Sequence, residues 1–149
     1  WQLLDRVRSQ GTWRQTSGQS QTTETGPGAD LALLARGPFG AEAERWILLG
    51  TPLTADDLPQ RVALAHRVAH YWPGSDTLTR QAVYLALAGR REEAARVLGK
   101  TLAGFPGRTA LVCTLLREAA QANPAAIEPL IDMLGPHPTG AACTLRNAP

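Results

Sequence analysis

Residues 78–106 read LTRQAVYLALAGRREEAARVLGKTLAGFP, and this stretch decides the fold class. Apolar side chains recur every three or four residues on both sides of Gly89, which is the spacing of a buried helix face. Gly89 lies where a first helix has to end, because glycine adopts the left-handed conformation of a helix C-cap without steric cost. Glu92 and Glu93 follow, where the dipole of a second helix favours acidic side chains. The stretch therefore predicts a helical hairpin that Pro106 closes.

The prolines that end predicted helices recur at a nearly constant interval. Pro73, Pro106 and Pro138 are 33 and 32 residues apart, and a period near 34 is typical of stacked helix–turn–helix units. The unit at 78–106 resembles a tetratricopeptide repeat in its small, turn, packing and closing residues, which are Ala82, Gly89, Ala94, Leu98 and Pro106. We predict an all-α fold of tetratricopeptide-like helical hairpins that stack into an α-α superhelix. Such a superhelix leaves a concave groove for a partner.

The composition excludes several classes of protein. The chain has 149 residues, enough for one domain with a hydrophobic core. The net charge of +2 comes from basic residues spread along the chain, so no nucleic-acid footprint is indicated. No stretch approaches the ~20 apolar residues of a membrane-spanning helix, and none resembles a signal peptide. Because the chain starts at Trp1 without an initiator Met, we expect it to be processed or excised from a longer polypeptide.

Start and stop signals divide the chain into three predicted parts. The first has short helices and a polar linker rich in Ser, Thr, Gln and Gly, the second has the helical repeats, and the third is an extended tail. Their ranges are residues 1–50, with the linker at about 15–28, residues 51–135 and residues 136–149.

Capping residues predict where the helices of the second part begin. Thr54 is the expected N-cap of its first helix, with Asp57 completing a capping box. Asn123 and Pro124 form the cap and first turn of its last helix. Pro129 lies inside that last helix and is expected to bend or split it, because proline lacks the backbone N–H and clashes with the preceding turn.

Three phrases between residues 46 and 106 carry a more specific resemblance. They are TPLT at 51–54, HRVAHYWP at 66–73, and YLALAGRREEAARVL at 84–98 followed by GFP at 104–106. These phrases resemble the C-terminal region of membrane-bound protein O-oligosaccharyltransferases. Those bacterial enzymes include the pilin glycosylases and are relatives of the O-antigen ligases.

The resemblance implies a soluble domain on the periplasmic side of the bacterial inner membrane, after the last membrane helices. Such enzymes transfer a glycan from an undecaprenyl-diphosphate carrier to Ser or Thr of an acceptor protein such as pilin. Their catalytic residues belong to the membrane part and its large periplasmic loop, so we expect no catalytic residue, cofactor or metal in this fragment. Its role is then acceptor docking or structural support.

The implied partners are the acceptor protein, the membrane part of the same chain and a lipid-linked glycan, with no nucleic acid. The alternative function is a free-standing tetratricopeptide-type adaptor for protein–protein interaction, unconnected with glycosylation. The sequence upstream of Trp1 distinguishes the two, since about ten hydrophobic spans there would indicate the membrane enzyme.

Six residues are candidates for partner binding, and each has a structural alternative. His66 and His70 share a helix face at metal-ligand spacing, but no third ligand is near, so a solvated polar face is the better interpretation. An aromatic pair that ends a helix packs into the next unit or stacks on a sugar face. An Arg pair, with Arg96 and Lys100 further along the same predicted helix, meets a phosphate or an acidic partner or forms the outer face of the repeat, which is the better interpretation. The aromatic pair is Tyr71 and Trp72, and the basic pair is Arg90 and Arg91.

The two cysteines, Cys113 and Cys143, leave two interpretations open. In a reducing compartment they are buried small residues. In an exported domain they form a disulfide that pins the C-terminal tail onto a helix.

Overall fold

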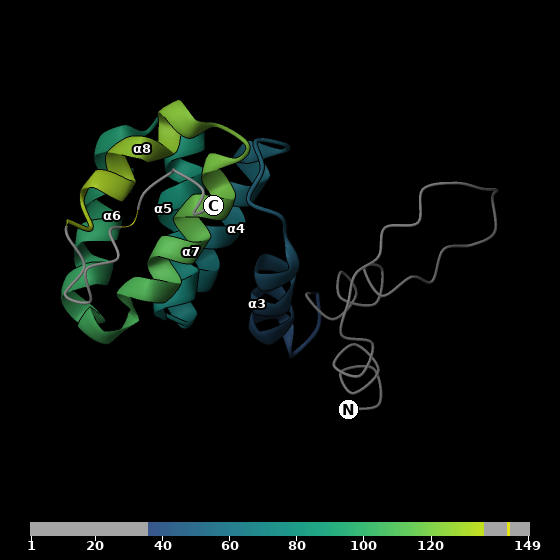
Figure 1. Cartoon of the computed structure of the whole chain (residues 1–149). Coiled ribbons are helices and arrows are strands. Elements are labelled where there is room, and N and C mark those ends of the chain that lie inside the picture. The colour runs from purple at the N-terminus through teal and green to yellow at the C-terminus, as the bar shows by residue number, and fades with distance from the viewer. Residues whose placement is uncertain (1–35, 136–142, 144–149) are drawn as a thin grey trace. The chain divides into compact units, whose positions relative to one another are not determined.

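The computed structural model describes residues 36–135 and Cys143 (Figure 1). The helix and linker predicted before residue 36, and nearly all of the predicted tail, lie outside these residues. Within them the regular secondary structure consists of six α-helices and one short 3₁₀ helix, with no strand. The all-α prediction is therefore confirmed for this part of the chain. No helix among these residues is long and apolar enough to cross a membrane.

The chain divides into two units between Gly50 and Thr51. The described helix of the first unit is α3, which spans Gly40–Gly50. It buries Ala43 and Leu48, and its Trp46 indole donates a hydrogen bond of 2.9 Å to Glu42 Oε1, one turn earlier. Helix α3 is therefore one of the short helices predicted for residues 1–50.

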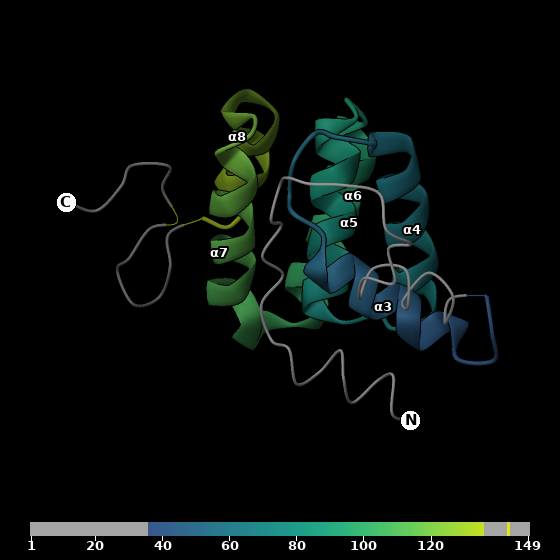
Figure 2. The same ribbon diagram turned by 90° about the vertical axis from the view of Figure 1, so that its right-hand side faces the viewer.

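The second unit is built around a central helix, α5. This helix contacts α4, α6, α7 and α8, and nine of its residues are buried. Helices α4, α5 and α6 form one layer, and α7 and α8 form a second layer on one side of it (Figures 1 and 2). The elements are α4 (Leu58–Tyr71), α5 (Ser75–Leu87), α6 (Arg91–Gly104), η1 (Pro106–Arg108), α7 (Thr109–Ala120) and α8 (Pro124–Asp132).

Helices α5 and α6 form the hairpin on which the fold prediction rests. Gly89 joins them at a φ of +79°, the left-handed region that glycine enters without strain. Its neighbour Arg90 donates a backbone hydrogen bond of 2.9 Å to the Leu85 carbonyl oxygen. Ala94 and Leu98, on the inner face of α6, have no exposed surface. The small side chain of Ala94 lets α6 approach α5 closely.

Helix α4 begins later than predicted. The expected cap, Thr54, lies four residues before the first helical residue, Leu58, and the N-cap is Asp57 at a φ of 49°. The Thr54 hydroxyl donates instead to Asp56 Oδ2 at 2.7 Å and accepts from Arg61 Nη1 at 2.8 Å. The capping prediction was wrong because Arg61, a residue of α4, donates to the Thr54 hydroxyl, which a cap would instead use to accept a backbone N–H of the first turn.

The segment before α4 is tied to α4 and α5 by its carbonyl groups. The Pro52 carbonyl oxygen accepts hydrogen bonds from Arg61 Nη1 at 2.9 Å and from the Tyr84 hydroxyl at 3.1 Å. The Thr51 carbonyl oxygen accepts from Arg80 Nη1 at 2.9 Å. The Arg61 guanidinium lies 5.9 Å from the centre of the Tyr84 ring. Burial raises the pKa of Tyr84, against the lowering effect of Arg80 and Arg61.

Helix α8 begins as predicted but is not split. The Asn123 side chain accepts a hydrogen bond of 3.2 Å from the Ala126 amide, and Pro124 is in the first turn. The helix continues through Pro129 to Asp132. The missing N–H of Pro129 leaves the carbonyl of Ala125 without its helical partner, and both residues are exposed. Water satisfies an exposed carbonyl, so the helix need not break.

Candidate functional site

A groove of about 980 Å³ lies over α4, α5 and α6. This volume is at the upper end of the roughly 300–1,000 Å³ that small-ligand sites occupy. Its lining residues recur at three- and four-residue intervals along each helix, so one face of each helix contributes. The larger apolar side chains of the lining are Leu58, Val62, Leu78, Leu85 and Val97.

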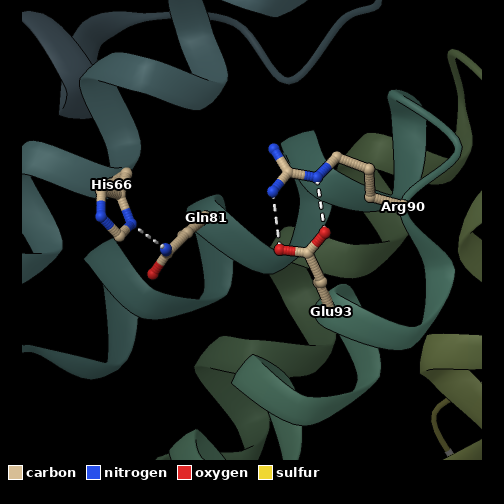
Figure 3. Close-up of polar contacts among 4 residues, drawn as sticks. All are labelled: His66, Gln81, Arg90 and Glu93. Carbon is tan, nitrogen blue, oxygen red and sulfur yellow. Dashed lines mark hydrogen bonds and ion pairs between the residues drawn. The ribbon is translucent and has the colours of Figure 1, made fainter.

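One polar contact connects α4 to α5 within the groove. Gln81 Nε2 lies 3.2 Å from His66 Nδ1 (Figure 3). Gln81 is only 9% exposed, and a buried amide without a partner would be costly. With the amide donating to Nδ1, the neutral imidazole carries its proton on Nε2. His66 therefore satisfies Gln81 in the groove, which its sequence pattern did not indicate.

A second polar contact lies at the start of α6. Arg90, the N-cap residue, folds back so that Nε and Nη2 donate to the two carboxylate oxygens of Glu93 at 2.7 and 2.6 Å (Figure 3). These hydrogen bonds lower the pKa of Glu93 and raise that of Arg90. The charge of Arg90 is therefore balanced by a neighbour in the first turn of its own helix.

The wall formed by α6 is cationic. Arg96 and Lys100, four residues apart, line the groove together with Arg90 and Glu93, and both are exposed. Three cations and one anion give the lining a net charge of +2 with His66 neutral. The groove residues from α4 and α5 include no Asp, Glu, Lys or Arg. The positive charge is therefore concentrated along one side.

The six candidate binding residues do not form one site. His66 and Arg90 line the groove, whereas Arg91 is exposed at the start of α6 and does not. The remaining three lie together at the end of α4, beyond the groove. There the His70 and Tyr71 rings meet edge to face with centroids 5.2 Å apart, and Tyr71 and Trp72 are 63% and 39% exposed.

Sequence reasoning missed most of the groove as a binding surface. For Arg96 and Lys100 it had preferred the outer face of the repeat over contact with a phosphate or an acidic partner, and it had not considered Gln81. Lys100 lies three residues after Val97, Arg96 lies four residues before Lys100, and Gln81 lies four residues before Leu85, and this helical spacing was the available signal. Among the residues with described positions, no group of three or more His, Cys, Asp or Glu side chains is placed to hold a metal ion.

A disulfide joins Cys113, on α7, to Cys143. Their Cα atoms are 5.7 Å apart and the two residues are 30 positions apart in sequence. This Cα separation is in the usual range for a disulfide. Of the two interpretations that the sequence left open, the structure has the bridged one, in which Cys143 is attached covalently to α7.

Comparison with known proteins gives the family of the chain. No curated protein and no solved structure matches it. A family model described as "Virulence factor membrane-bound polymerase, C-terminal" matches residues 28–117, a range that includes the three phrases of the sequence analysis. The match confirms the resemblance to the C-terminal region of membrane-bound, O-antigen ligase-like enzymes. Since it covers more than half of the 149 residues, the chain belongs to the family of C-terminal domains of virulence factor membrane-bound polymerases.

Proposed function

We propose that this domain docks the acceptor protein of a membrane-bound glycan transferase, and that the groove over α4, α5 and α6 is the docking surface. The groove is the observation that carries the proposal. In this view the membrane part of the enzyme transfers a lipid-linked oligosaccharide to Ser or Thr of an acceptor such as pilin. The helical layers of the domain form a tetratricopeptide-like superhelix that presents the groove.

The chemistry of the groove supports binding of a chain rather than catalysis. Its described lining contains no Ser, Thr or Cys, and its one carboxylate, Glu93, is held by two hydrogen bonds from Arg90. Its one imidazole, His66, is hydrogen-bonded to Gln81. The apolar residues of the floor and the polar residues of the edge resemble the core and rim of a protein interface.

The disulfide supports a position on the periplasmic side of the membrane. Disulfides persist in oxidising compartments such as the bacterial periplasm and are rare in the cytosol. The bridge between Cys113 and Cys143 therefore suits a domain that faces the periplasm. The membrane-bound family favours this assignment over a free-standing adaptor, whose groove would serve the same kind of contact.

The test is to block the groove in the membrane-bound protein that carries this domain. Val62→Glu places a charge on the apolar wall of α4, and we expect it to reduce both acceptor binding and glycan transfer. Leu111→Glu is the matched control, because Leu111 is 37% exposed on α7 and does not line the groove. Acceptor binding is measured with the purified domain, and transfer by the mass of the acceptor. Normal binding and transfer with Val62→Glu would show that the groove does not dock the acceptor.

A further inference from the structure

We infer that the groove binds an acidic amphipathic segment, a stretch of peptide with apolar side chains on one side and carboxylates along one edge. The inference rests on the proposed docking function and specifies the chemistry of the segment that docks. Its basis is the unequal distribution of charge over the three helices that line the groove.

The apolar side of the segment has a defined place. Leu58 and Val62, one turn apart on α4, face the groove together with Leu78 and Leu85 of α5. Leu85 is 4% exposed and belongs to the core as well as to the floor. Covering these side chains removes apolar surface from water, which is the general driving force of association.

The acidic edge has its counterpart on α6. Arg96 and Lys100 are four residues apart, so their backbone positions differ by about 6 Å along the helix. Carboxylates at positions i and i+4 of a helix, or i and i+2 of a strand, have a similar spacing of about 6–7 Å. Two acidic residues on one side of a docked segment therefore meet both cations at once.

The wall already holds one carboxylate of its own. Glu93 accepts hydrogen bonds from two guanidinium nitrogens of Arg90, Nε and Nη2, in the bidentate geometry that arginine forms with carboxylates. An acidic segment therefore meets Arg96 and Lys100 first. Glu93 limits the attraction by adding the only negative charge among the described residues of the lining.

The first test measures the binding of synthetic probes to the 149-residue chain by fluorescence anisotropy. The acidic probe is a labelled peptide of Leu and Glu with the spacing given above, and its analogue has Gln in place of every Glu. We expect the acidic probe to bind about tenfold more tightly, since an exposed ion pair contributes a factor of up to about five and two are formed, which sets an upper limit of about twenty-five-fold. Raising the ionic strength from ~0.1 M to ~1 M should remove most of the difference, because the Debye length falls from about 10 Å to about 3 Å. Equal binding of the two probes, or no binding of the acidic one, would overturn the inference.

The second test places the attraction on α6. The double variant Arg96→Glu, Lys100→Glu should bind the acidic probe about tenfold or more weakly than the parent does. Its affinity for the Gln analogue should be unchanged. Arg108→Glu, Arg117→Glu is the matched control, because it changes the net charge equally at two exposed residues outside the groove. Both variants should retain the helical circular dichroism of the parent, since all four side chains are exposed. Equal loss in the two variants would show that net charge alone attracts the probe and would refute the inference.

The third test removes a negative charge from the groove and should strengthen binding of the acidic probe. Glu93→Gln frees the Arg90 guanidinium and should tighten binding of the acidic probe by a factor of up to about five. Glu92→Gln is the control, because it removes the same charge from the same helical turn but does not line the groove. Equal effects of the two substitutions would count against a local contact at this wall.

The outcomes separate this inference from the proposed function. An acceptor that binds the domain through Val62, but is insensitive to charge reversal at Arg96 and Lys100, would refute the acidic edge and leave acceptor docking intact. Charge-dependent binding of the acidic probe, with no effect of Val62→Glu on glycan transfer, would support the chemistry of the groove and remove the acceptor as its partner.

Discussion

Removal of the disulfide between Cys113 and Cys143 should destabilise the domain by an amount that follows from its position. The two residues are 30 positions apart, so the bridge closes a loop of that length in the unfolded chain. The chain-entropy relation gives a stabilisation of about 3.6 kcal/mol for such a loop at 25 °C. Both cysteines are half-buried, so serine fits either position with little loss of packing. The loss should therefore be mainly the restored entropy of the unfolded chain.

The assay is thermal unfolding of the parent and of the double variant Cys113→Ser, Cys143→Ser, followed by circular dichroism. For a chain of this length a loss of 1 kcal/mol lowers Tm by roughly 2–4 °C, so the variant should melt about 7–14 °C lower. The reduced parent should melt with the variant, because reduction opens the same loop. Intact mass and thiol labelling under denaturing conditions verify the bridge in exported protein.

Two results would refute this reasoning. If the oxidised parent, with the bridge verified by mass, melts within about 2 °C of the reduced parent, closure of the loop does not stabilise the fold. If exported protein instead has two freely labelled thiols, the bridge does not form in the cell. That second result would also remove the support that the disulfide gives to a periplasmic position.

Three further substitutions test the helical hairpin and the contacts around it. Gly89→Val should lower the free energy of unfolding by about 1–2 kcal/mol, because a β-branched residue resists the left-handed conformation. Urea unfolding measures the loss, and Gly89→Asn is the control that should lose less. Ala94→Leu should cost roughly 1–3 kcal/mol by overpacking, whereas Ala103→Leu on the exposed face of α6 should be neutral, and an unchanged Tm for Ala94→Leu would contradict the close contact. Tyr84→Phe removes the donor to the Pro52 carbonyl oxygen and should cost about 1 kcal/mol near neutral pH. The folded state raises the pKa of Tyr84 above its ordinary value of 10.0. The parent should therefore lose stability as the pH rises from that value through the folded pKa. Unfolding measured over an alkaline pH series should show this loss in the parent and not in Tyr84→Phe.

The elements that the sequence predicted correctly are those determined by local interactions. Helix periodicity identified α5 and α6, and the left-handed turn between them needs only Gly89 and its neighbours. The same holds for Asn123, whose side chain caps the first turn of α8 from three residues away. The capping and C-cap contacts are contained in about six consecutive residues or fewer, from Leu85 to Arg90 at the turn and from Asn123 to Ala126 in α8.

The predictions that failed depend on residues distant in sequence. The start of α4 moved because Arg61, seven residues after Thr54, takes the Thr54 hydroxyl and carbonyl as acceptors. The binding surface was incomplete for the same reason. His66 and Gln81 are 15 residues apart, and no local pattern indicates that an amide of α5 meets an imidazole of α4. Such a contact is determined by the way the two helices pack, which the period of either helix alone does not specify.

The tethered segment at 51–54 explains how residues outside the groove can determine its shape. On α4, Arg61 binds this segment while its neighbour Val62 lines the groove. On α5, Arg80 and Tyr84 bind the segment while their neighbours Gln81 and Leu85 line the groove. Consecutive residues of an α-helix point about 100° apart. The hydrogen bonds to the carbonyls of Thr51 and Pro52 therefore favour, together with the buried faces of α4 and α5, the rotation of each helix that points Val62, Gln81 and Leu85 into the groove. Residues 51–54 do not line the groove, but we expect substitutions at Arg61, Arg80 or Tyr84, whose side chains bind this segment, to change the shape of the groove.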